Sequence, residues 1–170
     1  MSRKDGNTFW RWSLDAYELN GVKNRLIYLQ DAFGFDVNLS LWCCWRAAQG
    51  EILTEDALRN ADTASAGWNE GVIEPLREAR QNARSGPPAL YEQLKEAELA
   101  AEHCEQDVLF ALSGPEKTAS FDETVAAARV NMALYASLLD APRRDGFSSA
   151  LLRDLIDHIF PPDKKDSGRT

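Results

Sequence analysis

Residues 37–49 read VNLSLWCCWRAAQ, and this stretch decides the fold. Its polar side chains are few: Asn38, Ser40, Arg46 and Gln49. A helix that is apolar on most sides is usually buried on most sides. Asp36 stands just before the stretch and is a residue type that caps helix N-termini well. We therefore expect residues 37–49 to form a helix at the centre of the core.

Apolar residues at helical spacing continue on both sides of this stretch, and Gly and Pro separate the segments. No strand is predicted, because polar and apolar residues never alternate for more than a few positions. Further helices are expected at about residues 8–20, 22–33, 54–65, 68–83, 90–111, 120–139 and 148–160. Proline within a helix removes a donor and clashes with the preceding turn, so we expect Pro75 to cause a kink or a restart.

The segment 90–139 predicts a long antiparallel hairpin. Its apolar residues recur at steps of four and three on either side of a loop, and Ser120 and Glu123 have capping-box spacing. The predicted fold class is therefore all-α. We expect a single-domain bundle of about six or seven helices that contains this hairpin and spans residues 1–160. Residues 161–170 are expected to be a disordered tail.

Composition excludes several classes of function. The 170 residues suffice for a core without disulfides or a structural metal. The 27 acidic side chains exceed the 19 basic ones, and a net charge of −8 argues against nucleic-acid binding. No apolar run approaches the ~20 residues of a membrane span, and the N-terminal residues show no secretory signal. We expect no cofactor, no nucleic acid and no membrane as partners.

Three carboxylates, Glu98, Glu102 and Glu105, fall on one side of one predicted helix. A metal-dependent hydrolase would use such a row, with Arg77 or Arg129 holding a phosphate, but it would need a second acidic pair on a neighbouring helix. The sequence offers no such pair. The favoured interpretation is structural: Arg77 lies near Glu96 or Glu98, and the hairpin places Arg129 opposite Glu105.

A second candidate site surrounds the turn at Gly34. Capping explains Asp36 fully, but it explains its polar neighbours only in part. Amides that point inward must find partners or a ligand, because each unpaired buried amide costs about 1–3 kcal/mol. The sequence therefore predicts a small polar pocket, with these candidate residues: Gln30, Asp31, Asp36, Asn38, Trp45 and Trp68.

No metal site or catalytic residue is predicted. Cys104 falls on the apolar seam of its helix and His103 falls off it, so the two point apart and His103 is expected to be exposed. Cys43 and Cys44 are expected to be buried, inert thiols.

Several short strings of the sequence resemble one family of proteins. They are Phe9-Trp10, Ser13-Leu14, Tyr17, Leu29-Gln30-Asp31, Gly34, Asp36-Val37-Asn38-Leu39, Trp45, Trp68, Pro75-Leu76-Arg77, Glu98, Glu105-Gln106, Asn131 and Leu134-Tyr135. These strings resemble an uncharacterised proteobacterial family of small all-helical proteins that is labelled only as a domain of unknown function. The most specific part is residues 29–45. The resemblance implies a bacterial, cytoplasmic protein and carries no activity, cofactor or catalytic residue.

Two hypotheses about function follow. The first is a non-enzymatic cytoplasmic module that binds a protein partner or itself and has a regulatory role. The final predicted helix, with Leu152, Ile156 and Phe160, would be its interface if the core does not use that helix fully. The alternative is the metal-dependent hydrolase, acting on a small molecule that contains phosphate. A small ligand bound in the pocket between residues 30 and 38 is a third possibility.

Overall fold

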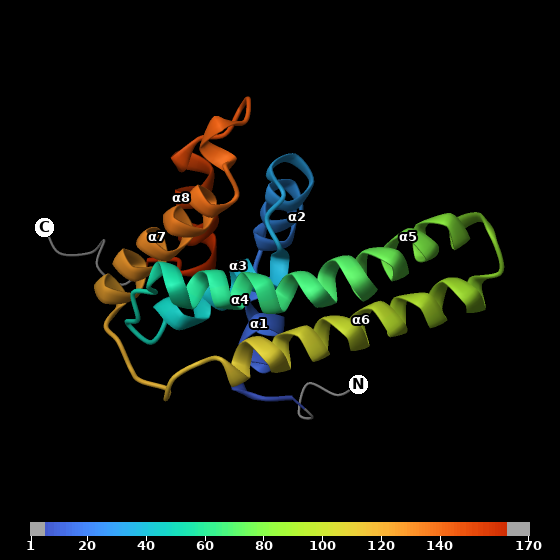
Figure 1. Cartoon of the computed structure of the whole chain (residues 1–170), viewed down its shortest axis with the longest axis horizontal. Helices are drawn as coiled ribbons and strands as arrows, with labels where there is room; N and C mark the ends of the chain where they lie inside the picture. The colour runs from blue at the N-terminus through green and yellow to red at the C-terminus, as the bar shows by residue number, and fades with distance from the viewer. Residues whose placement is uncertain (1–5, 163–170) are drawn as a thin grey trace, which may run out of the picture.

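The computed structural model of the chain describes residues 6–162, and within them every regular element is helical (Figure 1). The α-helices are α1 (Thr8–Glu18), α2 (Val22–Phe33), α3 (Val37–Ala47), α4 (Glu55–Trp68), α5 (Glu74–Asn82), α6 (Pro88–Ala111), α7 (Phe121–Leu138) and α8 (Ser149–Ile159). A short π-helical segment, η2 (Asn69–Ile73), called the π-turn below, joins α4 to α5 without a break. The three segments therefore form one rod. The predicted all-α bundle is confirmed, and the predicted tail lies mostly outside the described residues.

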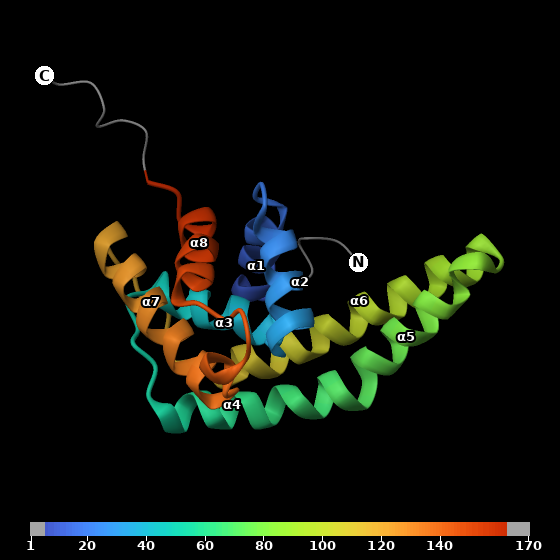
Figure 2. The same cartoon turned by 90° about the horizontal axis from the view of Figure 1, so that it is seen from above.

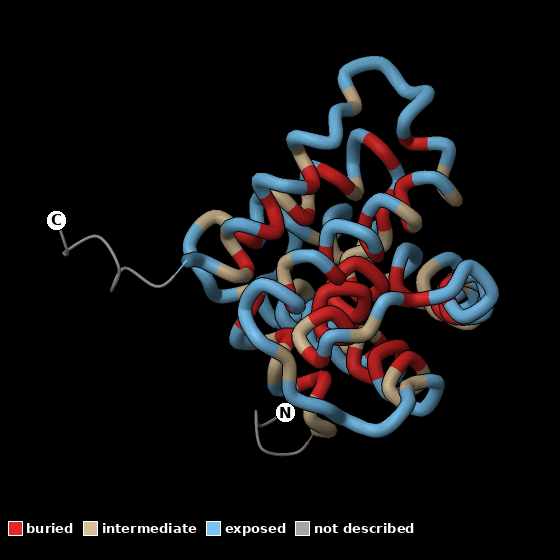
Figure 3. Tube along the Cα trace, turned by 90° about the vertical axis from the view of Figure 1, so that its left-hand side faces the viewer, coloured by how far each residue is buried: buried red, intermediate tan, exposed pale blue. Residues whose placement is uncertain are grey.

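Helix α3 lies at the centre of the core, as its sequence predicts. All ten residues from 38 to 47 are buried, and α3 packs against α1, α2, α4, α6 and α7. Buried residues gather in the middle of the molecule and exposed ones lie on its outside (Figure 3). The Asp36 carboxylate caps the helix and accepts a hydrogen bond of 2.8 Å from the backbone N–H of Leu39. The other elements pack around this helix. Helices α1, α2, α3, α7 and α8 together are called the body below.

The α4–η2–α5 rod and α6 run side by side and extend away from the body as a two-helix arm (Figures 1 and 2). The π-turn sets which face of the rod meets α6. A regular helix repeats its face every ~3.6 residues, so the buried face of Ser65 would return at about residue 72. The π-turn takes up one additional residue, so Ile73 is buried instead. Arg77 and Arg80 then follow on the face that meets α6.

The predicted hairpin of residues 90–139 is wrong in its pairing, although both of its helices exist. Helix α6 packs on α4 and α5, whereas α7 packs on α3 and α8, and the two run in different directions (Figure 2). The capping box of Ser120 and Glu123 is present as predicted. The periodicity of each seam correctly indicates a helix, but it does not determine which helix is the neighbour.

Helix α8 closes the far side of the body. Leu152 and Ile156 are only 4% and 0% exposed, because the core uses the apolar face of this helix. The condition for an interface on this helix, that the core leaves its apolar face free, is therefore not met at these two residues. Within residues 6–162, no helix combines the length and apolar character needed to cross a membrane.

Candidate functional site

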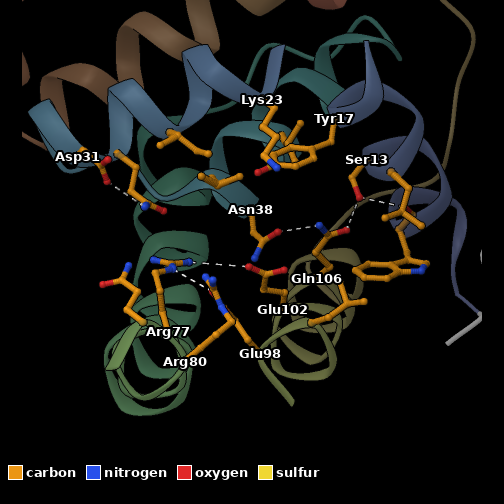
Figure 4. A pocket seen from close by; sticks show the side chains of 18 of the residues that line it. Ser13, Tyr17, Lys23, Asp31, Asn38, Arg77, Arg80, Glu98, Glu102 and Gln106 are labelled. Atoms are coloured by element: carbon orange, nitrogen blue, oxygen red, sulfur yellow. Dashed lines mark hydrogen bonds and ion pairs between the residues drawn. The ribbon is translucent and has the colours of Figure 1, made fainter. Parts of the chain in front are cut away.

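A cavity of about 540 Å³ lies where the arm leaves the body, between α1, α2, α3, α5 and α6 (Figure 4). Its volume falls within the usual range for small-molecule sites, about 300–1,000 Å³. Most of the lining side chains are polar or charged. Those polar residues are Ser13, Tyr17, Lys23, Gln30, Asp31, Asn38, Arg77, Arg80, Gln81, Arg84, Tyr91, Glu98, Glu102 and Gln106.

The floor of this pocket is a chain of buried hydrogen bonds that connects four helices. The Ser13 hydroxyl donates to the Gln106 side-chain oxygen at 2.8 Å, and the Gln106 amide donates to the Asn38 oxygen at 2.7 Å. The Asn38 amide donates to the Glu105 carboxyl at 2.7 Å, and the Ser65 hydroxyl donates to the other oxygen of that carboxyl. Buried polar groups that are fully satisfied in this way hold one arrangement rigidly.

One wall of the pocket is an ion-pair cluster between α5 and α6. The Glu98 side chain is 9% exposed and both of its oxygens are engaged. Arg77 Nε donates to Oε1 at 3.1 Å, and the Arg80 guanidinium contacts both oxygens. Arg80 also donates to the hydroxyl of Tyr91 at 3.2 Å. The cluster therefore fixes the arm helices to each other beside the cavity.

Glu102 faces the same cavity but is only weakly paired. Its nearest cation is Arg77, with Nη2 at 3.8 Å from Oε1, and its side chain is 30% exposed. Burial raises the pKa of Glu102 to about 7, and the nearby charge of Glu98 adds to this effect. A carboxyl group with this pKa changes its charge near neutral pH, which is a frequent property of functional sites.

Glu105 and Asp36 form a second carboxyl pair beneath the floor. Glu105 is 0% exposed, and burial together with the charge of Asp36 raises its pKa to about 8. Burial also raises the pKa of Asp36. Two neighbouring buried carboxyls cannot both ionise without strong repulsion, so this pair retains a proton at neutral pH.

The pocket brings together part of the site predicted around Gly34. Gln30, Asp31 and Asn38 line the cavity, with Asn38 buried at its floor. Asp36 caps α3 and does not line the cavity. The two predicted tryptophans lie elsewhere. Trp45 packs in the core against Phe9 and Phe110, and Trp68 lies half-buried at the end of α4.

The acidic row is divided between three environments. Glu98 meets Arg77 as the structural interpretation predicts, Glu102 faces the cavity, and Glu105 is buried against Asn38 and Ser65. The expectation that Arg129 lies opposite Glu105 is wrong, because α7 does not pack along α6. Arg129 instead lies 3.9 Å from Asp157 of α8.

The predicted exposures of His103 and Cys104 are reversed. His103 is 5% exposed and its ring lies 4.2 Å from that of Trp10, whereas Cys104 is exposed. Cys43 and Cys44 are buried as predicted, and burial raises the pKa of Cys44 to about 12. Across residues 6–162, no three His, Cys, Asp or Glu side chains gather as metal ligands would.

Several residues of the pocket could not be predicted from the spacing of residues in the sequence. Ser13 and Tyr17 are one helical turn apart on α1, and Lys23 lies in the first turn of α2, so nothing in their spacing connects them to Asn38 or to Gln106. Ser13, Tyr17 and Gln106 do occur in the strings that carry the family resemblance. That resemblance is the only sequence signal that could have grouped them.

The fold and the pocket together define an all-α protein with a polar cavity between its core and a helical arm. The chain belongs to the family described as Protein of unknown function (DUF2390), whose family model matches residues 8–109. No curated protein and no solved structure matches the chain. The predicted membership in a family of unknown function is confirmed, and its proteobacterial origin stays a prediction. Every residue that lines the cavity lies inside the matched segment.

The buried carboxyl pair makes stability depend on pH. Between pH 4.5 and about 8, the folded state retains a proton on Glu105 that the unfolded chain has lost. The free energy of unfolding therefore falls as the pH rises through this window. Glu105→Gln removes this proton, while its side-chain oxygen still accepts from Asn38 and its amide donates to the oxygen of the Ser65 hydroxyl. We expect the variant to gain about 1–3 kcal/mol in the free energy of unfolding over the wild type between pH 5 and pH 8, measured by urea unfolding.

Glu92→Gln, at an exposed position of α6, is the control. If the free energy of unfolding of Glu105→Gln falls with pH as steeply as that of the wild type, the assignment of the proton to Glu105 is contradicted.

Proposed function

We propose that this chain is a non-enzymatic binding module whose pocket between the body and the arm takes a small polar molecule. The observation that carries the proposal is the contrast between the floor and the walls of the pocket. The side-chain oxygen and the amide nitrogen of both Asn38 and Gln106 at the floor are hydrogen-bonded within the protein. The hydroxyl and ammonium groups of Tyr17 and Lys23 on the wall make no hydrogen bond to any other described residue and face the cavity (Figure 4).

The buried network supports a binding role because a simple core would not need it. Well-packed apolar residues often replace buried polar groups with no loss of stability. Five polar side chains from α1, α3, α4 and α6 nevertheless meet under the cavity. Such a network holds the floor in one arrangement, which preorganises a site for a ligand.

The arrangement of the acidic residues favours binding over metal-dependent hydrolysis. Hydrolysis of this kind needs several carboxylates free to hold a divalent ion. Both oxygens of Glu98 are engaged by arginines, and those of Glu105 by Asn38 and Ser65. Glu102 is left as the one carboxylate of the row that is available to the cavity.

A protein partner, or self-association, forms the second part of this proposal, with the bound ligand regulating the contact. Ile52, Phe121 and Val130 support it, since these large apolar side chains on or beside α7 are 60%, 48% and 46% exposed. We place the module in a bacterial cytoplasm. Three free cysteines, one of them exposed, are typical of proteins in a reducing compartment.

Thermal unfolding against a panel of small polar metabolites tests the proposal. At a ligand concentration a hundredfold above the dissociation constant, binding adds about 2.7 kcal/mol, which raises Tm by about 5–10 °C for a chain of this size. Gln81→Trp places a bulky ring at the exposed rim of the cavity and should abolish the shift. Gln93→Trp, at an exposed position of α6 outside the cavity, should preserve it. A panel without any shift, or a shift that Gln81→Trp leaves intact, would reject a ligand site here.

A further inference from the structure

The groups that the pocket offers to a ligand are mainly positive or hydrogen-bond donors. Lys23 lies over the ring of Tyr17, with Nζ 5.8 Å from its centroid, and has no acidic partner among the described residues. The same holds for Arg84 at the outer end of α5. Arg77 binds Glu98 through Nε and directs Nη2 toward Glu102 at the longer distance of 3.8 Å.

The local charge of the pocket opposes that of the whole protein. The chain has a net charge of −8. Four cations line the cavity, Lys23, Arg77, Arg80 and Arg84, against the three carboxylates Asp31, Glu98 and Glu102. The charge of Glu102 is partial at neutral pH, because its pKa is about 7. The cavity is therefore a positive region on an acidic molecule, and such a region attracts anions selectively.

We propose that the ligand is a small organic oxyanion, an inference that rests on the function proposed above. The ammonium of Lys23, the hydroxyl of Tyr17 and the guanidinium of Arg77 would hold its negative oxygens. Figure 4 shows Lys23 and Tyr17 converging from one side of the cavity while Arg77 faces them from the other. These residues lie on α1, α2 and α5, so the oxyanion would connect the arm to the body. Ammonium and guanidinium groups are the usual protein partners of carboxylate and phosphate oxygens.

The remaining walls explain why the anion should be organic. Leu14, Ile27, Val37 and Leu41 contribute an apolar surface to the same cavity. A cavity of about 540 Å³ far exceeds the size of an inorganic anion. An apolar or neutral body of the ligand would lie on these side chains while its oxyanion meets the donors.

Titration calorimetry on the purified full chain tests this inference with named probes. The probes are inorganic phosphate and glutarate as oxyanions, with putrescine and glycerol as a cationic and a neutral counterpart, all at constant ionic strength set by sodium chloride. We expect at least one oxyanion to bind and both counterparts to show no binding. Binding of phosphate alone identifies a phosphate site, and binding of glutarate alone identifies a carboxylate site.

Three variants connect the binding to the residues named. Lys23→Met and Tyr17→Phe should each weaken oxyanion binding at least tenfold, while circular dichroism and Tm report an intact fold. Lys95→Met removes an exposed lysine of α6 that does not line the cavity, and should leave binding unchanged. This control is needed because phosphate stabilises folded proteins without a specific site.

The outcomes separate this inference from the proposed function. Equal binding by Lys23→Met and Lys95→Met would overturn the oxyanion site, as would the absence of binding by both oxyanions. Binding of putrescine or glycerol that Gln81→Trp abolishes would overturn the oxyanion class while supporting a ligand pocket. If Gln81→Trp leaves the binding of every compound unchanged, the pocket itself is wrong and both proposals fail.

Discussion

Replacement of Asn131 by leucine is expected to lower the free energy of unfolding by about 3–5 kcal/mol, one of the two largest effects predicted for this protein. Asn131 lies in α7 and is 0% exposed. Its oxygen accepts from the Leu53 N–H at 2.8 Å, and its amide donates to the Cys43 and Glu51 carbonyls at 3.2 and 3.0 Å. Leucine has a similar volume but removes all three of these hydrogen bonds, including the one that the Leu53 N–H donates.

Two further variants make this prediction specific. Asn131→Asp retains the acceptor for Leu53 but loses both donated bonds and buries a charge, so it should also be strongly destabilising. Asn24→Leu changes the same residue type at an exposed position of α2 and should alter stability by less than about 0.5 kcal/mol. Urea unfolding provides the measurement. A loss below 1 kcal/mol for Asn131→Leu would show that this side chain does not hold α7 to the segment after α3.

The second large effect concerns the ion-pair cluster of the arm. Replacing both Arg77 and Arg80 by methionine leaves the buried Glu98 carboxylate without a cation. Removing the partners of a buried charge usually costs about 3–5 kcal/mol. The arginines are each 22% exposed, so we expect about 3 kcal/mol here.

Adding Glu98→Met to this double variant should restore most of the lost stability, since an apolar cluster then replaces the ion pairs. Arg59→Met is the matched control. It breaks an exposed pair with Glu55 and should cost no more than about 1 kcal/mol. Equal stability of the double and triple variants would mean that the unpaired Glu98 carboxylate costs no stability, which would contradict the prediction.

Local signals in the sequence predict much of the fold. The expected second helix matches α2 in both bounds, and the expected caps Asp36 and Ser120 both accept hydrogen bonds from helix N-termini. Residues close in the sequence determine these features, so propensity and capping rules suffice. The break expected near residues 65–67 does not occur, because α4 continues through the π-turn into α5.

Helix α6 shows why the tertiary arrangement could not be predicted in the same way. Its buried face carries Glu98, Glu105 and Gln106, whereas Leu90 and Leu99 are 45% and 38% exposed. A rule that directs apolar residues inward therefore orients this helix incorrectly, and this error led to the mistaken pairing with α7. Polar residues can lie inside because arginines of α5 and amides of α3 and α6 satisfy them. Polar residues on a buried face, against the usual apolar pattern, are expected where a functional site is built.

The candidate site could be predicted only in fragments for the same reason. Gln30, Asn38 and the pairing of Arg77 with Glu98 follow from local arguments about capping, burial and charge. Tyr17 and Lys23 join them only because α1 and α2 fold over the arm. That placement depends on the packing of five helices, which no spacing within one of them encodes.

The π-turn at Asn69–Ile73 also has a consequence for comparing relatives of this protein. It accommodates one surplus residue while leaving the orientation of α5 unchanged. A relative that is shorter by one residue here would therefore form an uninterrupted α-helical rod, with the equivalents of Arg77 and Arg80 still beside its cavity. Alignments that forbid a gap in this segment would pair non-equivalent arginines. A single-residue deletion placed within the turn is the alignment that keeps equivalent positions together.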